Sequence, residues 1–181
     1  MADHTANAML AAIRSMREVV IPALDPAHPL AREQAGLVVK YLEFWSGRFD
    51  HVAERNRAEL TAYVAMGQDL KAHAHDVSPG LEEELGKALD SARTALGHPS
   101  RDIEAVRRGV TTLTEVITAL VRTATAAQHP LTDQISRIVV QRTEPVALLQ
   151  RSWFGPQGWE DPLPPDLVQV LAQQLGEGAP S

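Results

Sequence analysis

The chain has 181 residues, a formal net charge of −6, no cysteine, and 44% hydrophobic residues with only 4% aromatic. Without cysteine, disulfides, iron–sulfur clusters and thiolate zinc sites are excluded. The acidic balance argues against nucleic acid as the main partner, because phosphates require a basic surface. We expect no membrane span, since no run of about 18 apolar residues occurs, and the absence of a secretion-signal pattern leads us to expect a cytoplasmic protein.

Charge is distributed unevenly along the chain. Residues 91–151 carry eight arginines against five acidic residues, whereas residues 1–90 and 152–181 are net acidic. The simplest interpretation is a solvated surface. The alternative is an arginine surface for an acyl phosphate, CoA or an acidic partner.

The first expected helix covers residues 5–21, because Met9, Ile13, Met16 and Val20 recur at spacings of three and four. Three prolines then predict a connector that ends near residue 29.

The longest expected helix runs from about residue 29 to 75, since no proline interrupts residues 30–78. Ser46-Gly47 is a place where this helix could bend. Its apolar stripe comprises Val38, Leu42, Trp45, Phe49, Val52, Asn56, Leu60, Tyr63, Gly67 and Leu70. Asn56 falls inside the stripe, where a buried amide needs hydrogen-bond partners. A helix this long leaves apolar surface uncovered, so we expect a homodimer or a complex with a partner.

Three more long segments have a helical pattern. Ser78 and Pro79 predict an N-cap and first turn for a helix that ends at Gly97. The next helix carries the clearest heptad seam: Ile103, Val106, Val110, Leu113, Ile117, Leu120 and Ala124. A helix from Thr132 follows, which we expect Pro145 to break or kink.

Residues 152–165 form an irregular segment rich in proline and tryptophan, and a short helix is expected over residues 166–175. Short connectors between amphipathic helices favour antiparallel neighbours. The predicted fold is therefore all-α, an antiparallel bundle of four to five helices with one long member and a short C-terminal helix. The expected domains are a bundle over residues 1–151 and a tail over residues 152–181 packed on it.

Aromatic residues are the best candidates for binding. Tyr41, Trp45 and Phe49 cluster on the long helix, where core packing is the simpler explanation. Trp153, Phe154 and Trp159 lie in the tail, where they either cover an end of the bundle or anchor a ligand or partner. With Asn56 and Tyr63, these residues form the expected ligand- or partner-binding set.

Metal and catalytic motifs are weak. No Glu-x-x-His pair of the di-iron bundle type occurs. Asp69, His73, His75 and Asp76 are the densest set of potential metal ligands, but His75 lies about 200° around the helix from His73. We therefore expect no metal, no cofactor and no catalytic residue, and a binding protein rather than an enzyme.

The N-terminal segment carries an arginine-containing helix with Arg14, then Val20-Ile-Pro-Ala-Leu24, then Ala31-Arg32. Over residues 11–42 it resembles the opening helices of small α-helical proteins encoded beside aminoglycoside-phosphotransferase-like kinases in bacterial hydroxyacid and levulinate catabolism. The resemblance implies an accessory protein of a kinase or acyl-CoA pathway.

The leading hypothesis is thus a non-catalytic helical accessory or protein-interaction protein of bacterial metabolism, with a homodimer or a kinase or acyl-CoA-pathway protein as partner. The second is a bundle that binds a small molecule or acyl ligand in a pocket lined by Trp45, Phe49 and Tyr63. The third is a ferritin-like metal-dependent enzyme.

Overall fold

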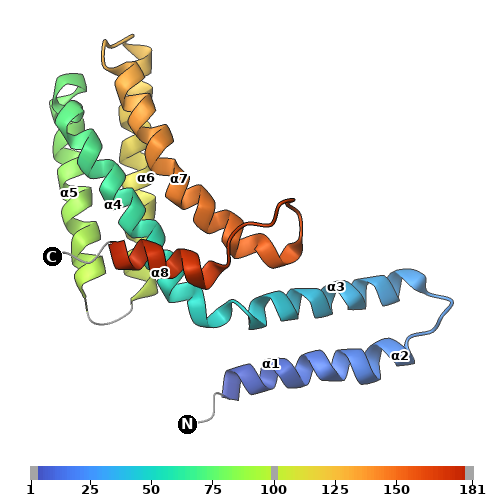
Figure 1. Cartoon of the computed structure of the whole chain (residues 1–181). Helices are drawn as coiled ribbons and strands as arrows, with labels where there is room; N and C mark the ends of the chain where they lie inside the picture. Colours follow the sequence, from blue (N-terminus) through green and yellow to red (C-terminus); the bar gives the residue numbers. More distant parts are fainter. Residues whose placement is uncertain (1–3, 99–101, 178–181) are drawn as a thin grey trace. The chain divides into compact units, whose positions relative to one another are not determined.

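The structure is a computed structural model that describes residues 4–98 and 102–177, and these residues form helices and connectors without a strand (Figure 1). The predicted all-α class is confirmed. Contacts within the chain define two compact units, residues 1–52 and residues 53–181. This division does not coincide with the boundary expected at residue 151. That boundary, between a bundle and a tail packed on it, stays a prediction.

The first unit is a helical hairpin. Helix α1 (His4–Ser15) continues into a π-helical turn, η1 (Met16–Val20), and a short α2 (Ile21–Ala23). Helix α3 (Pro29–Ser46) then returns beside α1 (Figure 1). The extent predicted for the first helix is confirmed, with the π-helical turn inside it.

Little of this hairpin is buried. Among its described residues, Ile13 of α1 and Val39 of α3 are the fully buried hydrophobic side chains. An ion pair between Arg17 and Glu43, at 2.6 Å, also joins the two arms. Two helices share only one contact face, so a hairpin of this size has no enclosed core of its own.

The expected long helix is divided. Helix α3 ends at Ser46, a turn at Gly47 and a 3-10 turn, η2 (Phe49–His51), follow, and α4 (Val52–Val77) begins next. Gly47 caps α3 by donating its N–H to the Glu43 carbonyl at 3.2 Å. Continuity over residues 29–75 was therefore a wrong prediction, although the division falls at the bend expected at Ser46-Gly47.

The division also changes which residues face inward. Val39 is buried in the hairpin, whereas Val38, which the stripe placed inward, is exposed. Phe49 is 53% exposed, so its predicted core position is wrong as well. A stripe drawn through a helix break carries the register of one helix into the next, where it no longer applies.

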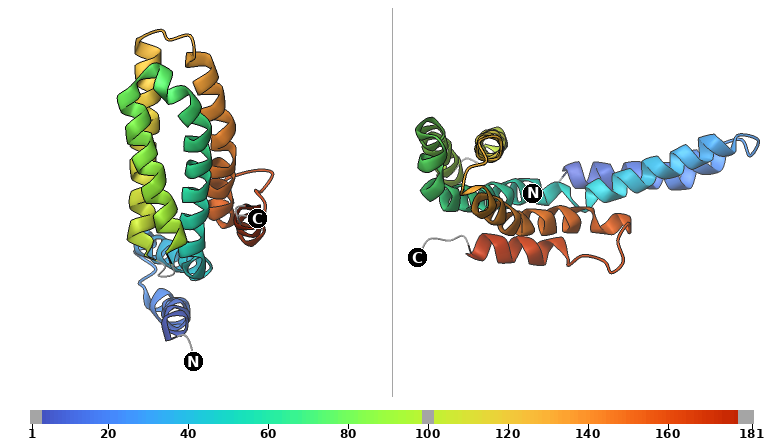
Figure 2. Two further views of the ribbon diagram at one scale, coloured as in Figure 1. Left: turned by 90° about the vertical axis from the view of Figure 1, so that its left-hand side faces the viewer. Right: turned by 90° about the horizontal axis from the view of Figure 1, so that it is seen from above.

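The second unit is built on four helices packed side by side, α4, α5 (Pro79–Gly97), α6 (Ile103–Ala126) and α7 (Thr132–Phe154) (Figure 2). Short connectors join them, and neighbouring helices run in opposite directions (Figure 1). The predicted antiparallel bundle is thus confirmed in this unit.

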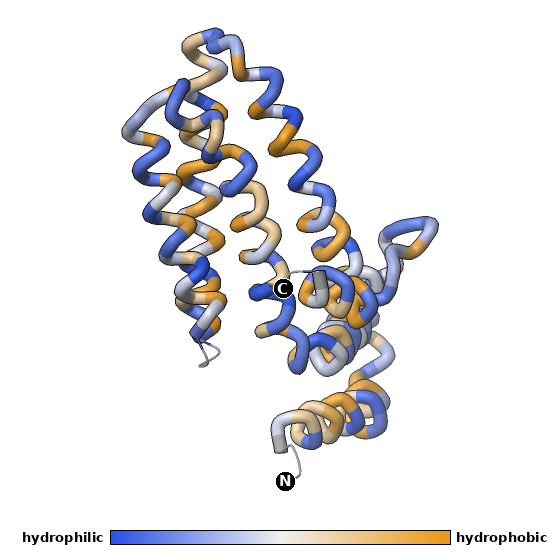
Figure 3. The backbone as a smooth tube through the Cα atoms, turned by 60° about the vertical axis from the view of Figure 1, so that its left-hand side comes forward, coloured by the Kyte–Doolittle hydropathy of each residue, from blue (hydrophilic) through white to orange (hydrophobic). Residues whose placement is uncertain are grey.

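The core of the bundle follows the predicted seams. Hydrophobic and hydrophilic positions alternate along each helix (Figure 3). The largest buried side chains are leucines and one isoleucine, at Leu60, Leu70, Leu85, Leu89, Leu113, Leu120 and Ile135. Gly109 allows α6 to approach Leu60, because a Cβ at residue 109 would lie only 3.0 Å from a Leu60 methyl.

The C-terminal segment covers part of α7. Pro145 lies inside α7, which continues without a break to Phe154, so of the two expected effects, a break or a kink, the break does not occur. Helix α8 (Leu167–Glu177) packs along α7 and buries Leu167 and Val170. The Gln174 side chain of α8 donates to the Pro145 carbonyl at 2.8 Å, which ties the two helices together.

Candidate functional site

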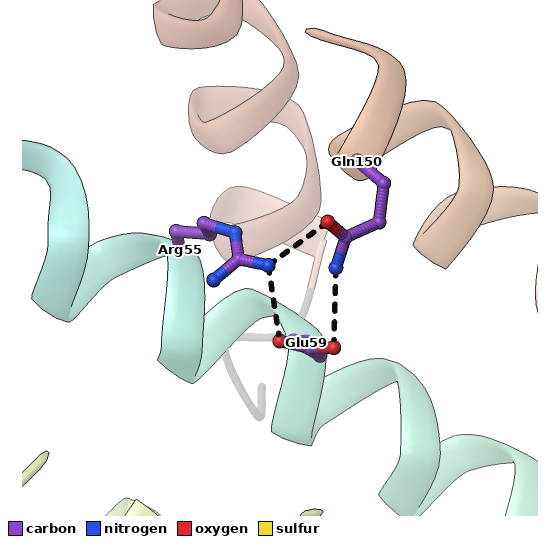
Figure 4. Close-up of polar contacts among 3 residues, drawn as sticks. All are labelled: Arg55, Glu59 and Gln150. Atoms are coloured by element: carbon purple, nitrogen blue, oxygen red, sulfur yellow. Dashed lines mark hydrogen bonds and ion pairs between the residues drawn. The ribbon is translucent and has the colours of Figure 1, made fainter. Parts of the chain in front are cut away.

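A polar cluster joins α4 to α7 inside the bundle (Figure 4). The Arg55 guanidinium donates to the Gln150 side-chain oxygen at 2.9 Å and lies 3.8 Å from the Glu59 carboxylate. The Gln150 amide in turn donates to Glu59 at 3.3 Å. Each of the three side chains therefore contacts the other two.

This cluster is largely shielded from solvent. The side chains of Arg55 and Glu59 are 21% and 17% exposed. The Arg55 guanidinium also lies 5.0 Å from the centre of the Trp153 ring, a cation–π contact that covers one face of the arginine. The ion pair on α4 and its two hydrogen bonds to Gln150 stabilise the α4–α7 contact, and they leave the buried Arg55 Nε without a hydrogen-bond partner among the described residues.

The three aromatic residues expected in an irregular tail separate into two environments, and Trp153 and Phe154 lie in the last turn of α7 instead of in an irregular segment. Trp153 is buried in the bundle beside Arg55. Phe154 and Trp159 are exposed and stack on each other at 6.1 Å, with an angle of 21° between their rings. The expectation that these residues cover part of the bundle fits Trp153, whereas Phe154 and Trp159 form a small surface pair.

The four potential metal ligands near the end of α4 do not converge. Asp69 accepts a hydrogen bond from Arg142 at 2.6 Å, and His75 contacts Glu82 at 2.7 Å. The His73 ring lies 3.2 Å from the Gln134 amide. Over the described residues, no group of three or more His, Cys, Asp or Glu side chains is placed to hold a metal ion.

An open groove of about 530 Å³ runs between α5 and α6. Its polar lining is formed by Ser91, Thr94, His98, Asp102, Arg108 and Thr112. Asp102 already caps α6, because its carboxylate accepts the Ala105 N–H at 3.1 Å. The groove therefore presents hydroxyls, the His98 imidazole and the Arg108 guanidinium, while the Asp102 carboxylate is engaged in the helix cap.

One ion pair shifts the ionisation of its members. A hydrogen bond from Lys87, together with its charge, holds the pKa of Glu83 below its ordinary value. The same contact with Glu83 raises the pKa of Lys87. Both residues are fully exposed and one helical turn apart on α5, so this is a surface helix pair rather than a tuned catalytic group.

The outer side of α3 is an apolar surface that the hairpin leaves uncovered. Leu30, Leu37 and Tyr41 are 65%, 50% and 60% exposed, and Val38 beside them is exposed too. The Tyr41 ring contacts the Trp45 ring edge-on at 6.2 Å. This face, formed by Leu30, Leu37, Val38 and Tyr41, is called the outer α3 face below.

The predicted binding residues are thus distributed over several places. Tyr41 and Trp45 lie on α3, Phe49 in the turn after it, and Asn56 and Tyr63 on α4. Asn56 is buried, as its position in the stripe predicted. The pocket expected among Trp45, Phe49 and Tyr63 stays a prediction.

Sequence reasoning missed two groups of residues. Arg55, Glu59 and Gln150 come together across about 90 residues of chain, which no local pattern indicates. Leu30 and Leu37, in contrast, were detectable, because their spacing of seven continues to Tyr41 at helical intervals.

Comparison with known proteins adds no relative: no family model, curated protein or solved structure matches the chain. Among the helices that the structure describes, none combines the length and the hydropathy that crossing a bilayer requires.

Proposed function

We propose that this protein is a non-catalytic helical interaction protein, in which the outer α3 face docks a helical partner and the bundle of residues 53–177 serves as a scaffold. The observation that carries the proposal is that α3 is apolar on two opposite sides. At about 100° per residue, Leu30, Leu37 and Tyr41 lie within about 40° of one another and about 180° from Val39.

One of these two sides is covered and the other is open. Val39 is buried within the hairpin, while the three opposite side chains are at least half exposed. An amphipathic helix with one partner needs only one apolar stripe. A second stripe on the far side is typical of a helix that packs against two neighbours, and contiguous exposed apolar surface of this kind marks protein contacts.

The polar sites favour the same conclusion. In the Arg55–Glu59–Gln150 cluster each side chain contacts the other two, and three of the four potential metal ligands, Asp69, His73 and His75, are engaged by separate partners. An accessory role in a kinase or acyl-CoA pathway, which the N-terminal resemblance implies, would use the same docking face.

The test is whether the outer α3 face is required for association. The native complex is isolated from the protein's own host and its intact mass is measured by native mass spectrometry. We expect a mass above that of one 19.7 kDa chain, and we expect Leu37→Glu to reduce it to the single chain, because a charge would be buried in an apolar contact.

Val140→Glu is the matched control, since Val140 is an exposed apolar residue on α7 and its change should leave the complex intact. A single-chain mass for the unaltered protein under all conditions would contradict the proposal. So would a complex that Leu37→Glu leaves unchanged.

A further inference from the structure

We infer that the partner of the outer α3 face is a second copy of this chain, whose α3 packs against the first in the antiparallel direction. This inference rests on the proposed docking function and specifies its partner.

The outer face of α3 has the periodicity of a helix-pairing seam. Leu30, Gln34, Leu37, Tyr41 and Phe44 follow one another at intervals of four, three, four and three. This is the alternation that places side chains along the contact line between two packed helices. A partner with the same alternation is required to interdigitate with it, and another α3 supplies one.

The charges on α3 suit self-association. Arg32 and Lys40 balance Glu33 and Glu43, so the helix has no net charge to repel a copy of itself. Glu33 and Lys40 are exposed, and neither makes an ion pair within the part of the chain that the structure describes. They are seven residues apart and therefore lie on the same edge of the seam.

The position of these two charges selects the direction of pairing. In an antiparallel pair, the residues on this edge of one helix face the same edge of the other. We consider the register in which Leu30 lies opposite the partner's Tyr41 and Gln34 lies opposite the partner's Leu37. In this register Glu33 lies opposite the partner's Lys40. By two-fold symmetry the contact occurs twice.

A parallel pair gives no such contacts. There, Glu33 and Lys40 would face Val38 and Trp45 of the other copy, which carry no charge. The antiparallel arrangement thus gains two ion pairs that the parallel arrangement lacks, while both cover Leu30, Leu37 and Tyr41.

The expected dimer is reversible and of moderate affinity. Helix α3 has 18 residues, which is about 27 Å at about 1.5 Å per residue. One helix of this length per copy makes an interface at the small end of the specific range. The dimer should accordingly dissociate on dilution through the micromolar range.

The experiment measures the dimer dissociation constant of the purified full-length chain by sedimentation equilibrium, for the unaltered protein and four variants. Glu33→Lys and Lys40→Glu each bring two like-charged pairs together, and we expect each to raise the constant about tenfold. The double variant Glu33→Lys/Lys40→Glu restores opposite charges and should return the constant close to its original value. Leu37→Glu should abolish dimerisation.

Direction is tested by cross-linking, which the absence of native cysteine makes specific. Equal amounts of Leu30→Cys and Tyr41→Cys proteins are mixed and oxidised. Antiparallel pairing should give disulfides between the two variants, whereas parallel pairing would join each variant to itself and would overturn the inference.

The outcomes separate this inference from the docking function. A purified chain that is monomeric, but forms a Leu37-dependent complex with another protein in its host, would overturn the second copy and leave the docking face in place. A dimer that Leu37→Glu does not affect would overturn both. A Leu37-dependent dimer in which the double charge variant is no tighter than the singles would overturn the antiparallel register. Circular dichroism of every variant confirms that helix content is retained.

Discussion

The Gln150 side chain shows how a single residue is placed by the whole bundle. It lies on α7, accepts a hydrogen bond from Arg55 of α4 at 2.9 Å, and donates one to Glu59 at 3.3 Å. Both partners are mostly shielded from water. Removing the amide would leave part of a guanidinium and part of a carboxylate without a hydrogen-bond partner in a site where water has limited access.

We therefore predict that Gln150→Leu lowers the free energy of unfolding by about 1–3 kcal/mol, because leaving buried polar groups unpaired costs about this much. Chemical denaturation followed by circular dichroism measures the change. Gln141→Leu is the control: Gln141 is exposed on the same helix, and its substitution should change stability by less than about 0.5 kcal/mol. Equal effects of the two substitutions would show that the cluster contributes nothing.

The sequence did not predict contacts of this kind between distant polar residues. Arg55, Glu59 and Gln150 are polar residues of the kind usually found on helix surfaces, so their positions in the sequence do not indicate a contact. Only the packing of α4 against α7 brings them together. Trp153 was expected in an irregular segment, where it would either cover an end of the bundle or anchor a ligand or partner, whereas the structure buries it on α7. Its contact with Arg55 could not be predicted from the sequence either, because it also depends on the packing of α4 against α7.

At the scale of the helices, local patterns were reliable where one helix has one partner face. Five residues of the predicted α6 seam are buried, Val106, Leu113, Ile117, Leu120 and Ala124, whereas Val110 is partly buried and Ile103, at the start of the helix, is exposed. The inward-facing residues of helix α3 were predicted wrongly, because this helix has apolar residues on two sides. A single stripe drawn through both mixed them, and the exposed Leu30 and Leu37 were left out.

Helix ends show a similar contrast. Ser78 occupies the N-cap position of α5, but its side chain makes no capping hydrogen bond. Asp102 caps α6 by accepting the Ala105 N–H at 3.1 Å. The residue type at Ser78 was right for a cap, but whether the side chain turns back to the helix depends on its rotamer, which the sequence does not reveal.

Accordingly, Asp102→Ala should destabilise the protein by about 0.5–2 kcal/mol, since it removes both a cap and a negative charge at the start of α6. Ser78→Ala removes no capping hydrogen bond and should have a clearly smaller effect. Thermal unfolding of the two variants beside the unaltered chain measures the difference. A loss at Ser78 as large as that at Asp102 would contradict the observed capping geometry.

For the whole molecule, the important feature is the unequal burial of its two units. The main core cluster draws its buried residues from positions 60 to 135, so it lies entirely within the second unit. The hairpin buries few side chains of its own, and its outer α3 face is exposed. Composition did not reveal this difference, because the hairpin is the more apolar of the two units, with 28 hydrophobic residues of 52 against 52 of 129 in residues 53–181, and yet it buries fewer of them.

This difference predicts how the two parts behave when separated. A fragment of residues 53–181 should fold and unfold in one cooperative transition, because it retains every residue of the core cluster and the α7–α8 contact. A fragment of residues 1–52 should have low helix content when dilute, since short helices without a covered apolar face are marginal in water. Its helix content should rise with concentration if the outer α3 face pairs with another copy.

Circular dichroism of both fragments, across a range of concentrations and temperatures, tests this. The fragment carrying Leu37→Glu is the control, because it should keep the low helix content of the dilute hairpin at every concentration. A broad, non-cooperative transition of residues 53–181 would mean that the bundle depends on the hairpin for its stability. A fully helical, monomeric fragment of residues 1–52 would mean that the hairpin is stable alone. Association through the exposed leucines of α3 would then not be what stabilises its helices.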